Sequence, residues 1–582
     1  MSAGWLDASE LRVGLGCMRL STDPGFDQAQ AVATIAAAAQ AGITVFDTAH
    51  SYGRDTQDFG ANERLLARAL RVAGADRRAR IVTKGGMARV RDQWISDGRS
   101  RAIIADCEAS LAALDGLEID MYLVHAPDPR TPWRTTVRAL ARLVDEGMVR
   151  RVGLANVNRL QLEEALSITE ISAVQVALSP YDERAFRGGL VEFCETHGIT
   201  VMAHSPLGGP RRAAGLKRRQ PMADVASSTG ASAAEVALAW LLDLSPAVVP
   251  IPGARSPEHA RSSVRAARMA LGDSDRAKLR EAPDGRGPGR TGRRGSPPGA
   301  EVVIVMGIPG AGKSRVAELL VAEGYLRLNR DERGGSLRQL ASALDAELSG
   351  GARQVVLDNT YLTRASRSYV IEAANRHRAS IRCTWIDTPL AQAQVNLVGR
   401  LLERFGALPS PEQLREVARR EPGMLAPTSQ MRALRELEPP SADEGLARVE
   451  RVPFSRAQPA GPARAGVFVA VAALTRPGWH AAVEASLPAT PHLVFDWRPG
   501  GTPDELRDAV ANLSEAVSGT VEAALCAHQG GPPICWCRPP LPGLPLAFAQ
   551  ANGLDPARSI LVGTSAAHRT LATTLGATLV IV

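Results

Sequence analysis

The sequence predicts an α/β protein in which three α/β segments follow one another along the chain. Three observations support this prediction. Up to about residue 282, eight apolar strand-like runs alternate with helical stretches, which is typical of a (β/α)8 TIM barrel. At residues 301–314, a β-branched run leads into a glycine loop that ends in Lys-Ser, which predicts a central P-loop α/β domain. The last segment, 465–582, again begins and ends with strand-like runs and predicts a third α/β domain.

Length and composition agree with this organisation. The chain has 582 residues, of which 45% are hydrophobic and 22% charged, as in ordinary globular proteins. It contains no run of ~18 uncharged apolar residues, and the start MSAGWLDASE lacks the basic and apolar regions of a secretory signal. We therefore expect a cytoplasmic protein that has no membrane partner. The oligomeric state stays open.

The net charge of +7 permits a polyanionic partner without requiring one. Nearly all of the basic residues are arginine, and the chain has only four lysines: Lys84, Lys217, Lys278 and Lys313. Lysine offers a compact ammonium group whose pKa can be shifted, which a guanidinium group cannot. Two of the four, Lys84 and Lys313, lie inside motifs and are therefore candidate functional residues.

Ionisable residues lie near the ends of the predicted barrel strands. Asp47, Lys84 and His125 each lie near the end of such a run, and Tyr52 follows the second run. Because the active sites of (β/α)8 barrels form at the C-terminal ends of the strands, we expect these four side chains to meet there. The predicted strands are 13–18, 43–49, 80–86, 119–126, 149–156, 173–179, 199–205 and 248–254.

The segments FDTAHSYG (46–53), TKGG (83–86), LVHAPDP (123–129) and GLANVN (153–158) resemble the aldo-keto reductases. The resemblance covers roughly residues 10–270 and implies reduction of a carbonyl substrate by NADP(H). It also implies a catalytic tetrad of Asp47, Tyr52, Lys84 and His125. Tyr52 would donate the proton to the carbonyl oxygen once Lys84 lowers its pKa from ~10. Asp47 would pair with Lys84, and His125 would orient the carbonyl.

The same resemblance implies where the cofactor binds. Asn156 and Gln175 would hold the nicotinamide carboxamide, and Arg255 would face a 2′-phosphate. The phosphates would lie against Ser205, Leu207 and Gly253 to Arg255. The chain departs from the family pattern on this side at Ala155, where a serine is usual, at His204, where an aromatic often stacks on the nicotinamide, and at Ser262 and Ser263, which replace a Glu-Asn pair.

Residues 283–300 contain Pro, Gly and Arg without apolar periodicity, which predicts a linker between a barrel domain at 1–282 and a P-loop domain at 301–456. Its arginines could contact nucleic acid, but a solvated linker is the favoured interpretation.

The P-loop motif predicts ATP binding with Mg²⁺. Backbone N–H groups of the loop would surround the phosphates, together with the positive end of the following helix. Lys313 would reach the β- and γ-phosphates, and the Ser314 hydroxyl would hold the metal ion. The glycines leave room for backbone angles that a Cβ would hinder, and they are Gly307, Gly310 and Gly312.

Three later pieces resemble the polynucleotide 5′-kinases, especially those joined to a 3′-phosphatase: NRD (329–331), VVLDNT (355–360) and the tail 433–454. The resemblance implies transfer of phosphate to a 5′-hydroxyl end of DNA or RNA, with Asp331 as the base. The residues that would hold the substrate are Asp358, Asn359, Thr360 and Arg364, with Arg400 and Arg404 as lid arginines four positions apart on one helix face. A solvated helix face remains an equal interpretation for the last two. A small-molecule kinase and a nucleotide-binding scaffold without turnover also remain open.

The third segment carries Cys526-x-His528-x6-Cys535-x-Cys537, a spacing that suits a tetrahedral Zn²⁺ site. Its frame resembles the haloacid-dehalogenase phosphatases, in particular a group with such a zinc loop. In that family a strand carries two catalytic aspartates, and here the same places hold Ala470 and Ala472. The resemblance therefore implies a pseudo-phosphatase domain. The whole chain is expected to be a reductase fused to a kinase, with a role in nucleic-acid repair as a hypothesis.

Overall fold

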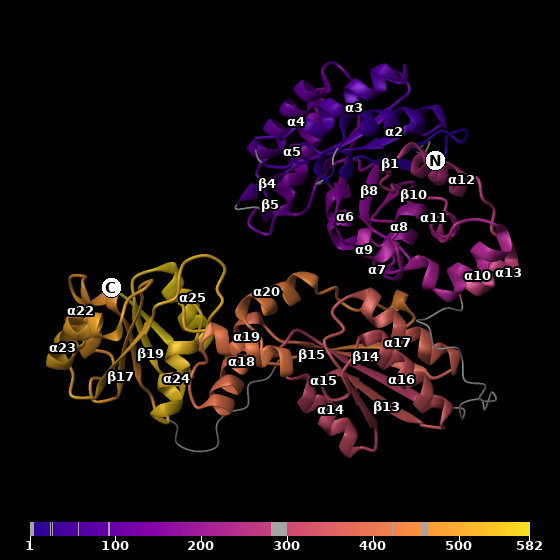
Figure 1. Ribbon diagram of the computed structural model, residues 1–582. Helices are drawn as coiled ribbons and strands as arrows, with labels where there is room; N and C mark the ends of the chain where they lie inside the picture. Colours follow the sequence, from indigo (N-terminus) through magenta and orange to yellow (C-terminus); the bar gives the residue numbers. More distant parts are fainter. Residues whose placement is uncertain are drawn as a thin grey trace. The chain divides into compact units, whose positions relative to one another are not determined.

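Eight parallel strands form a closed sheet in the first of the two units into which the chain divides, residues 1–291 and 292–582 (Figure 1). This computed structural model describes residues 5–23, 25, 27–55, 57–90, 93–280, 299–421, 423–454 and 464–582. The predicted linker at 283–300 therefore lies outside the described residues, apart from 299 and 300.

The barrel strands pair in the order β1-β2-β3-β6-β7-β8-β9-β10. A parallel bridge between Gly16 and Gly253 closes the ring, and the Gly16 N–H donates to the Pro252 carbonyl at 3.0 Å. All eight predicted strands are confirmed, although each is shorter than the apolar run that predicted it. They are β1 Gly14–Gly16, β2 Val45–Asp47, β3 Arg80–Gly85, β6 Met121–Val124, β7 Val152–Ala155, β8 Ala173–Ala177, β9 Thr200–His204 and β10 Val248–Pro250.

Helices pack around the barrel and bury its outer side in a large hydrophobic cluster. They are α1 Arg19–Thr22, α2 Gln28–Gln40, α3 Ala61–Val72, α4 Ser100–Leu114, α5 Trp133–Asp145, α6 Arg159–Leu166, α7 Arg184–Arg187, α8 Leu190–Thr196, α9 Pro210–Ala213, the 3₁₀ helix η1 Leu216–Arg218, α10 Gln220–Thr229, α11 Ala233–Leu244, α12 Pro257–Ala267 and α13 Asp273–Arg280. The sequence analysis missed an antiparallel hairpin, β4 Met87–Val90 and β5 Gln93–Ser96, between β3 and α4. Among the described residues no single helix has the length and apolarity of a membrane span, and only the sharply bent pair α10 and α11 passes when taken together.

Apolar side chains from several strands fill the inside of the barrel. Val45, Val82, Leu123 and Met202 are all fully buried there. Trp5 joins this cluster, and its indole N–H donates to Asp120. The barrel is thus a packed core, so its chemistry is confined to the polar residues at the ends of the strands.

The second unit contains two further parallel sheets of five strands each. The first has the order β12-β13-β11-β14-β15, with the P-loop strand in the centre. Its strands are β11 Glu301–Met306, β12 Leu326–Asn329, β13 Gln354–Asp358, β14 Ser380–Asp387 and β15 Arg448–Pro453. Its helices are α14 Lys313–Ala322, α15 Arg330–Arg333, α16 Leu337–Ser349, α17 Arg364–Arg376, α18 Leu390–Phe405, α19 Pro411–Arg420 and α20 Pro427–Glu436, and η2 is Ala442–Glu444.

The last sheet has the order β18-β17-β16-β19-β20. Its strands are β16 Val467–Ala470, β17 His492–Trp497, β18 Val521–Cys526, β19 Ile560–Gly563 and β20 Thr578–Ile581. Its helices are α21 Val471–Leu474, α22 Trp479–Glu484, η3 Pro503–Leu506, α23 Arg507–Ala516, α24 Gly543–Ala551, η4 Pro556–Arg558 and α25 Ala566–Leu575. One hydrophobic cluster contains residues of both 397–424 and 468–575, so the second and third predicted domains share a core.

Candidate active sites

Asp47, Tyr52 and Lys84 meet at the C-terminal end of the barrel strands. The Lys84 ammonium group donates to Asp47 Oδ1 and to the Thr48 carbonyl, both at 2.7 Å, and lies 3.3 Å from Tyr52 Oη. Lys84 is fully buried and Asp47 is 4% exposed. The His125 ring lies edge-on to Tyr52, with ring centres 5.7 Å apart. The four residues predicted from strand ends are therefore adjacent in space.

Burial is the largest single effect on the pKa values of Lys84 and Tyr52. It disfavours the charged form of Lys84, but the neighbouring Asp47 carboxylate and Tyr52 outweigh burial, and the pKa of Lys84 is raised. Burial also raises the pKa of Tyr52, and Lys84 offsets only part of this effect. Our expectation that Lys84 leaves Tyr52 with a lowered pKa is therefore wrong for this structure, because the buried phenolate would lose its hydration and would also face Asp47.

His125 is a neutral base in this environment. Burial, and then the charge of Lys84, lower the pKa of His125 to about 3. Its Nδ1 atom has no hydrogen-bond partner among the described residues. At neutral pH the ring is therefore an uncharged imidazole that remains free to hydrogen-bond a ligand beside Tyr52.

Two residues of the predicted cofactor side have a left-handed backbone, which is uncommon for residues other than glycine. These are Asn156, with φ 58°, and Ser205, with φ 51°. The Asn156 amide donates to the His125 carbonyl at 3.0 Å, and its Oδ1 lies 3.1 Å from His204 Nε2. The ring of His204, which departs from the family pattern, is thus hydrogen-bonded to the residue expected to hold the carboxamide.

Gln175 lies inside the catalytic cluster. Its Nε2 donates to Asp47 Oδ1 at 2.6 Å, so Asp47 accepts hydrogen bonds from both Gln175 and Lys84. Strand alternation could have suggested this contact, because Gln175 is in β8 and side chains inside a barrel point toward one another. The sequence analysis assigned it only to the cofactor.

Arg255 borders a cavity of about 230 Å³ at the N-terminus of α12. Its guanidinium group lies 3.2 Å from the Asp23 carboxylate, which also accepts from Arg19 at 2.7 Å. Two arginines and a helix N-terminus suit an anionic group, although Asp23 neutralises part of their charge. The other predicted phosphate residues differ in exposure, since Leu207 packs partly against the barrel core and Gly253 is exposed.

The P-loop adopts the predicted strand–loop–helix arrangement. β11 ends at Met306, α14 begins at Lys313, and Gly310 and Gly312 have left-handed backbones with φ 84° and 93°. A Cβ at Gly310 would lie 2.4 Å from the Ala393 carbonyl oxygen of α18. Gly310 is therefore required both by its backbone angles and by the close approach of α18. Gly307 has a positive φ as well, and Ser314 is exposed at the start of α14.

Lys313 faces a set of charged residues. In the absence of a ligand its ammonium group donates to the Ile308 carbonyl at 3.1 Å. Burial, and then the charge of Arg400, lower the pKa of Lys313 to about 8, while Asp358 and Asp331 oppose this shift. Three of the predicted substrate and base residues are thus close enough to act on the P-loop lysine.

This lowered pKa predicts a pH dependence of ATP binding. Below pH 8 Lys313 is protonated in both the free and the bound protein, so affinity should not change with its titration. Above pH 8 free Lys313 loses its proton, whereas phosphate would keep it charged, so affinity should fall by up to about tenfold per pH unit. Calorimetric titration with Mg²⁺–ATP across this range measures the effect. The Lys313→Arg variant should show no such fall, and an identical fall in that variant would contradict the assignment to Lys313.

The two predicted acidic residues have different surroundings. Asp331 is exposed on the first turn of α15, and the Asn329 side chain accepts its backbone N–H at 2.7 Å. Asp358 is only 2% exposed and accepts hydrogen bonds from Asn329 and Arg327. Asp331 is thus accessible to a substrate, whereas Asp358 also holds the ends of β12 and β13 together. Asn359, which is buried, accepts the backbone N–H of Thr360 at 3.0 Å.

The predicted arginines separate into two groups. Arg400 acts on Lys313, whereas Arg364 pairs with Asp443 at 2.6 Å and Arg404 pairs with Glu421 at 3.0 Å. Arg400 also lies beside Gly423, close to the Glu421 that pairs with Arg404, so the two arginines face the same segment. The sequence analysis missed Arg367, which is fully buried and pairs with Glu444 at 2.6 Å.

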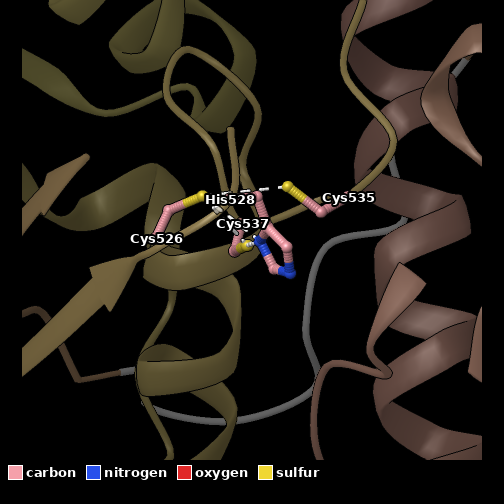
Figure 2. Close-up of side chains that lie close together, drawn as sticks. All are labelled: Cys526, His528, Cys535 and Cys537. Carbon is pink, nitrogen blue, oxygen red and sulfur yellow. Dashed lines mark hydrogen bonds between the residues drawn. The ribbon is translucent and has the colours of Figure 1, made fainter. Parts of the chain in front are cut away.

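The predicted zinc ligands converge on one point (Figure 2). Cys526 ends β18, and the other three follow in the loop before α24. Cys526 Sγ lies 3.8 Å from Cys535 Sγ and 3.5 Å from His528 Nδ1, and Cys537 Sγ lies 3.2 Å from the same nitrogen. Tetrahedral zinc with sulfur at ~2.3 Å separates two sulfurs by about 3.8 Å and a sulfur from a nitrogen by about 3.5 Å. Cys526 Sγ and Cys537 Sγ lie closer, at 3.3 Å. The four donors thus have the right chemistry for Zn²⁺ and lie within about 0.5 Å of tetrahedral spacing, so a bound ion would move Cys526 and Cys537 slightly apart.

The end of the third sheet lacks carboxylates where the resemblance would need them. Ala470 ends β16, and Ala472 lies in α21. Asp496, near the end of β17, is paired with Arg498 at 2.9 Å. Thr564 follows β19, and its backbone N–H donates to His568. Alanine, alanine and threonine thus stand at positions 470, 472 and 564, where the resemblance to the haloacid-dehalogenase phosphatases would need carboxylates.

Comparison with known proteins gives two family matches. The model for the aldo/keto reductase family matches residues 12–284, and a model described as an AAA domain matches residues 302–420. The barrel is similar to a probable aldo-keto reductase of Glycine max, with 31% identity over 47% of this chain and 85% of that protein. It is also similar to an uncharacterized oxidoreductase of Schizosaccharomyces pombe, with 29% identity over 46% of this chain and 86% of the other.

Solved structures of aldo-keto reductases are similar to a comparable share of this chain. An aldo/keto reductase of Klebsiella pneumoniae, solved with NADP and acetate, is 29% identical over 46% of this chain and 89% of its own, with a TM-score of 0.40. The thermostable aldo-keto reductase Tm1743, solved with the inhibitor epalrestat, is 31% identical over 46% of this chain and 93% of its own, with a TM-score of 0.39.

Proposed function

Because this chain belongs to the aldo/keto reductase family through residues 12–284, we propose that its barrel reduces a carbonyl substrate with NADP(H). The buried hydrogen-bond network of Asp47, Lys84 and Tyr52 carries this proposal. A bound nicotinamide would supply the hydride. Tyr52 Oη would donate the proton to the carbonyl oxygen, and Lys84, held by Asp47, would stabilise the phenolate left behind. Neutral His125 would hydrogen-bond the same oxygen and orient the substrate.

The residues present fit a phosphorylated nicotinamide cofactor. Asn156 would hold the carboxamide. The cavity beside Arg255 and Arg19 has room for a 2′-phosphate, which would compete with Asp23 for the two guanidinium groups. Oxidation of NADPH, followed by its absorbance with a panel of aldehydes and ketones, tests the proposal, with NADH as the comparison. A rate that does not depend on the added carbonyl compound would argue against it.

We further propose that the P-loop domain transfers the γ-phosphate of ATP to a 5′-hydroxyl end of DNA or RNA. The supporting observations are the strand–loop–helix geometry of the P-loop, which ends in Lys313 and Ser314, and the electrostatic influence of Asp358, Arg400 and Asp331 on Lys313. Ser314 would hold Mg²⁺, and exposed Asp331 would take the proton of the attacking hydroxyl. Arg400 would neutralise charge on the transferred group.

Transfer of labelled phosphate from ATP to oligonucleotides with 5′-hydroxyl ends tests this activity. Transfer to a small molecule and to neither nucleic acid would favour a metabolite kinase. ATP binding without transfer to any acceptor would favour a nucleotide-binding scaffold. A role of the fused reductase in reducing aldehyde groups on damaged nucleic-acid ends follows as a hypothesis. The test compares the full chain with the separate barrel in the rate of reduction of two substrates, an oligonucleotide with an aldehyde end and a small aldehyde. If both proteins reduce the two substrates equally well, the hypothesis is wrong.

We propose that the third part of the chain, residues 465–582, is a phosphatase-like domain that binds zinc and has no phosphatase activity. One zinc ion per chain is the expected result of metal analysis. Cys535→Ala should lower that content well below one, because three ligands hold Zn²⁺ more weakly than four. Cys383→Ala, which removes a buried cysteine of β14 away from the cluster, is the matched control. Equal zinc in both variants would contradict a site at these four residues.

A further inference from the structure

Helix α18 lies directly against the P-loop. The Asn396 amide donates to the Gly310 carbonyl at 2.8 Å, and Gly310 fits closely beside Ala393 and Leu397. Arg400, one turn further along the same helix, acts on Lys313. The position of α18 therefore sets both the shape of the loop and the place of the one predicted lid arginine that is near the lysine.

The apolar residues of α18 pack on the last sheet's helices instead. Val398, Leu401 and Leu402 are at most 2% exposed, and they belong to one hydrophobic cluster with residues of α24 and α25. Members of this cluster from the last sheet's side are Phe468, Leu544, Leu546, Phe548, Leu571 and Leu575. One face of helix α18 thus contacts the P-loop, and another packs on α24 and α25 of the domain that carries the Cys/His cluster.

Trp536 makes a second connection from the cysteine loop. It stands between Cys535 and Cys537, is 2% exposed, and donates its indole N–H to the Leu425 carbonyl at 2.9 Å. Leu425 lies two residues before the start of α20, in which buried Gln430 donates to the Pro309 carbonyl of the P-loop at 3.0 Å. A side chain flanked by two zinc ligands is therefore linked to the P-loop through a short chain of contacts.

We propose that Trp536 is a positioning residue for the P-loop, and that zinc at the Cys/His cluster fixes Trp536. The phosphatase-like domain then acts as a brace: it fixes the positions of α18 and α20, and these helices in turn fix the shape of the P-loop at Gly310 and the position of Arg400. Zinc would orient the two cysteines on either side of Trp536, and so the indole N–H that meets Leu425. The effect on catalysis rests on the proposed phosphotransfer, whereas the effect on the order of the P-loop does not.

The experiment compares Trp536→Ala with Trp479→Ala in the full chain. Both changes remove a buried tryptophan from the same domain, but Trp479 belongs to a different cluster, with Val469 and Val483. Amide hydrogen exchange of residues 307–314 and 390–405 is measured together with the affinity for Mg²⁺–ATP and the zinc content. If the alanine variant does not fold, Trp536→Phe takes its place, since it removes the N–H and the five-membered ring but keeps a buried aromatic ring.

We expect Trp536→Ala to retain zinc, to speed exchange in both segments and to weaken ATP binding by about tenfold. Removal of zinc from the unmodified chain should speed exchange in the same segments, and Trp479→Ala should change neither exchange nor affinity. Exchange and affinity that stay unchanged in Trp536→Ala would overturn the proposal, as would equal effects in the two tryptophan variants. If exchange responds as expected but the unmodified chain transfers no phosphate, the brace is supported and the kinase assignment fails.

Discussion

Tyr52→Phe is expected to lower kcat for carbonyl reduction by ~10²–10⁴-fold, because it removes the proton donor. The phenyl ring keeps the packing of the buried site, and Lys84 keeps its ion pair with Asp47 at 2.7 Å. Affinity for NADPH should therefore change little, so that the loss appears in kcat and the cofactor Kd stays constant. Steady-state kinetics with a small aldehyde, together with a fluorescence titration of NADPH, separates the two quantities.

Tyr122→Phe is the matched control. Tyr122 is also fully buried in the barrel, and its hydroxyl donates to the Ile103 carbonyl at 3.2 Å, outside the tetrad. The control should lose about 1 kcal/mol of stability and keep kcat within a few-fold. Two variants with equal kcat would exclude Tyr52 as the proton donor.

Lys313→Ala is expected to lower phosphate transfer by at least ~10²-fold, because it removes the ammonium group that the β- and γ-phosphates would contact. The lost charge also leaves the negative charges of Asp358 and Asp331 less compensated near the loop, which should disfavour binding of a triphosphate. Transfer of labelled phosphate to an oligonucleotide measures the rate, and carbonyl reduction by the same sample should be unchanged.

Lys278→Ala removes an exposed lysine that pairs with Asp275 in α13, and it should leave transfer unchanged. Label transfer that survives in Lys313→Ala at the rate of this control would show that the activity belongs to another site or to a contaminant.

The sequence was sufficient to predict those parts of the structure that depend on residues close together in the chain. Eight apolar runs predicted eight strands, and because parallel strands end at one face, the positions of Asp47, Lys84 and His125 near strand ends were enough to bring them together. The P-loop was predicted in the same way, since its strand, glycines and lysine are contiguous. Within the eight barrel strands only the ends differed, because an apolar run continues beyond the residues that pair with both neighbours.

Contacts between distant side chains could not be predicted in this way. Arg364 and Arg367 look alike in the sequence, yet the first is partly exposed beside Asp443 and the second is fully buried on Glu444. The pKa of Tyr52 was predicted with the wrong sign, because one neighbouring charge was considered without the loss of water around the phenol. Each case depends on burial, which is a property of the folded chain and not of a motif.

The shared cluster around α18 limits how this protein can be divided and how it can vary. A fragment that ends near residue 460 would leave Val398, Leu401 and Leu402 in water, so the P-loop domain should aggregate when expressed without the last 120 or so residues. Polar substitutions at the apolar residues of α24 and α25 that pack on α18 should likewise be poorly tolerated, because they would disrupt the same cluster.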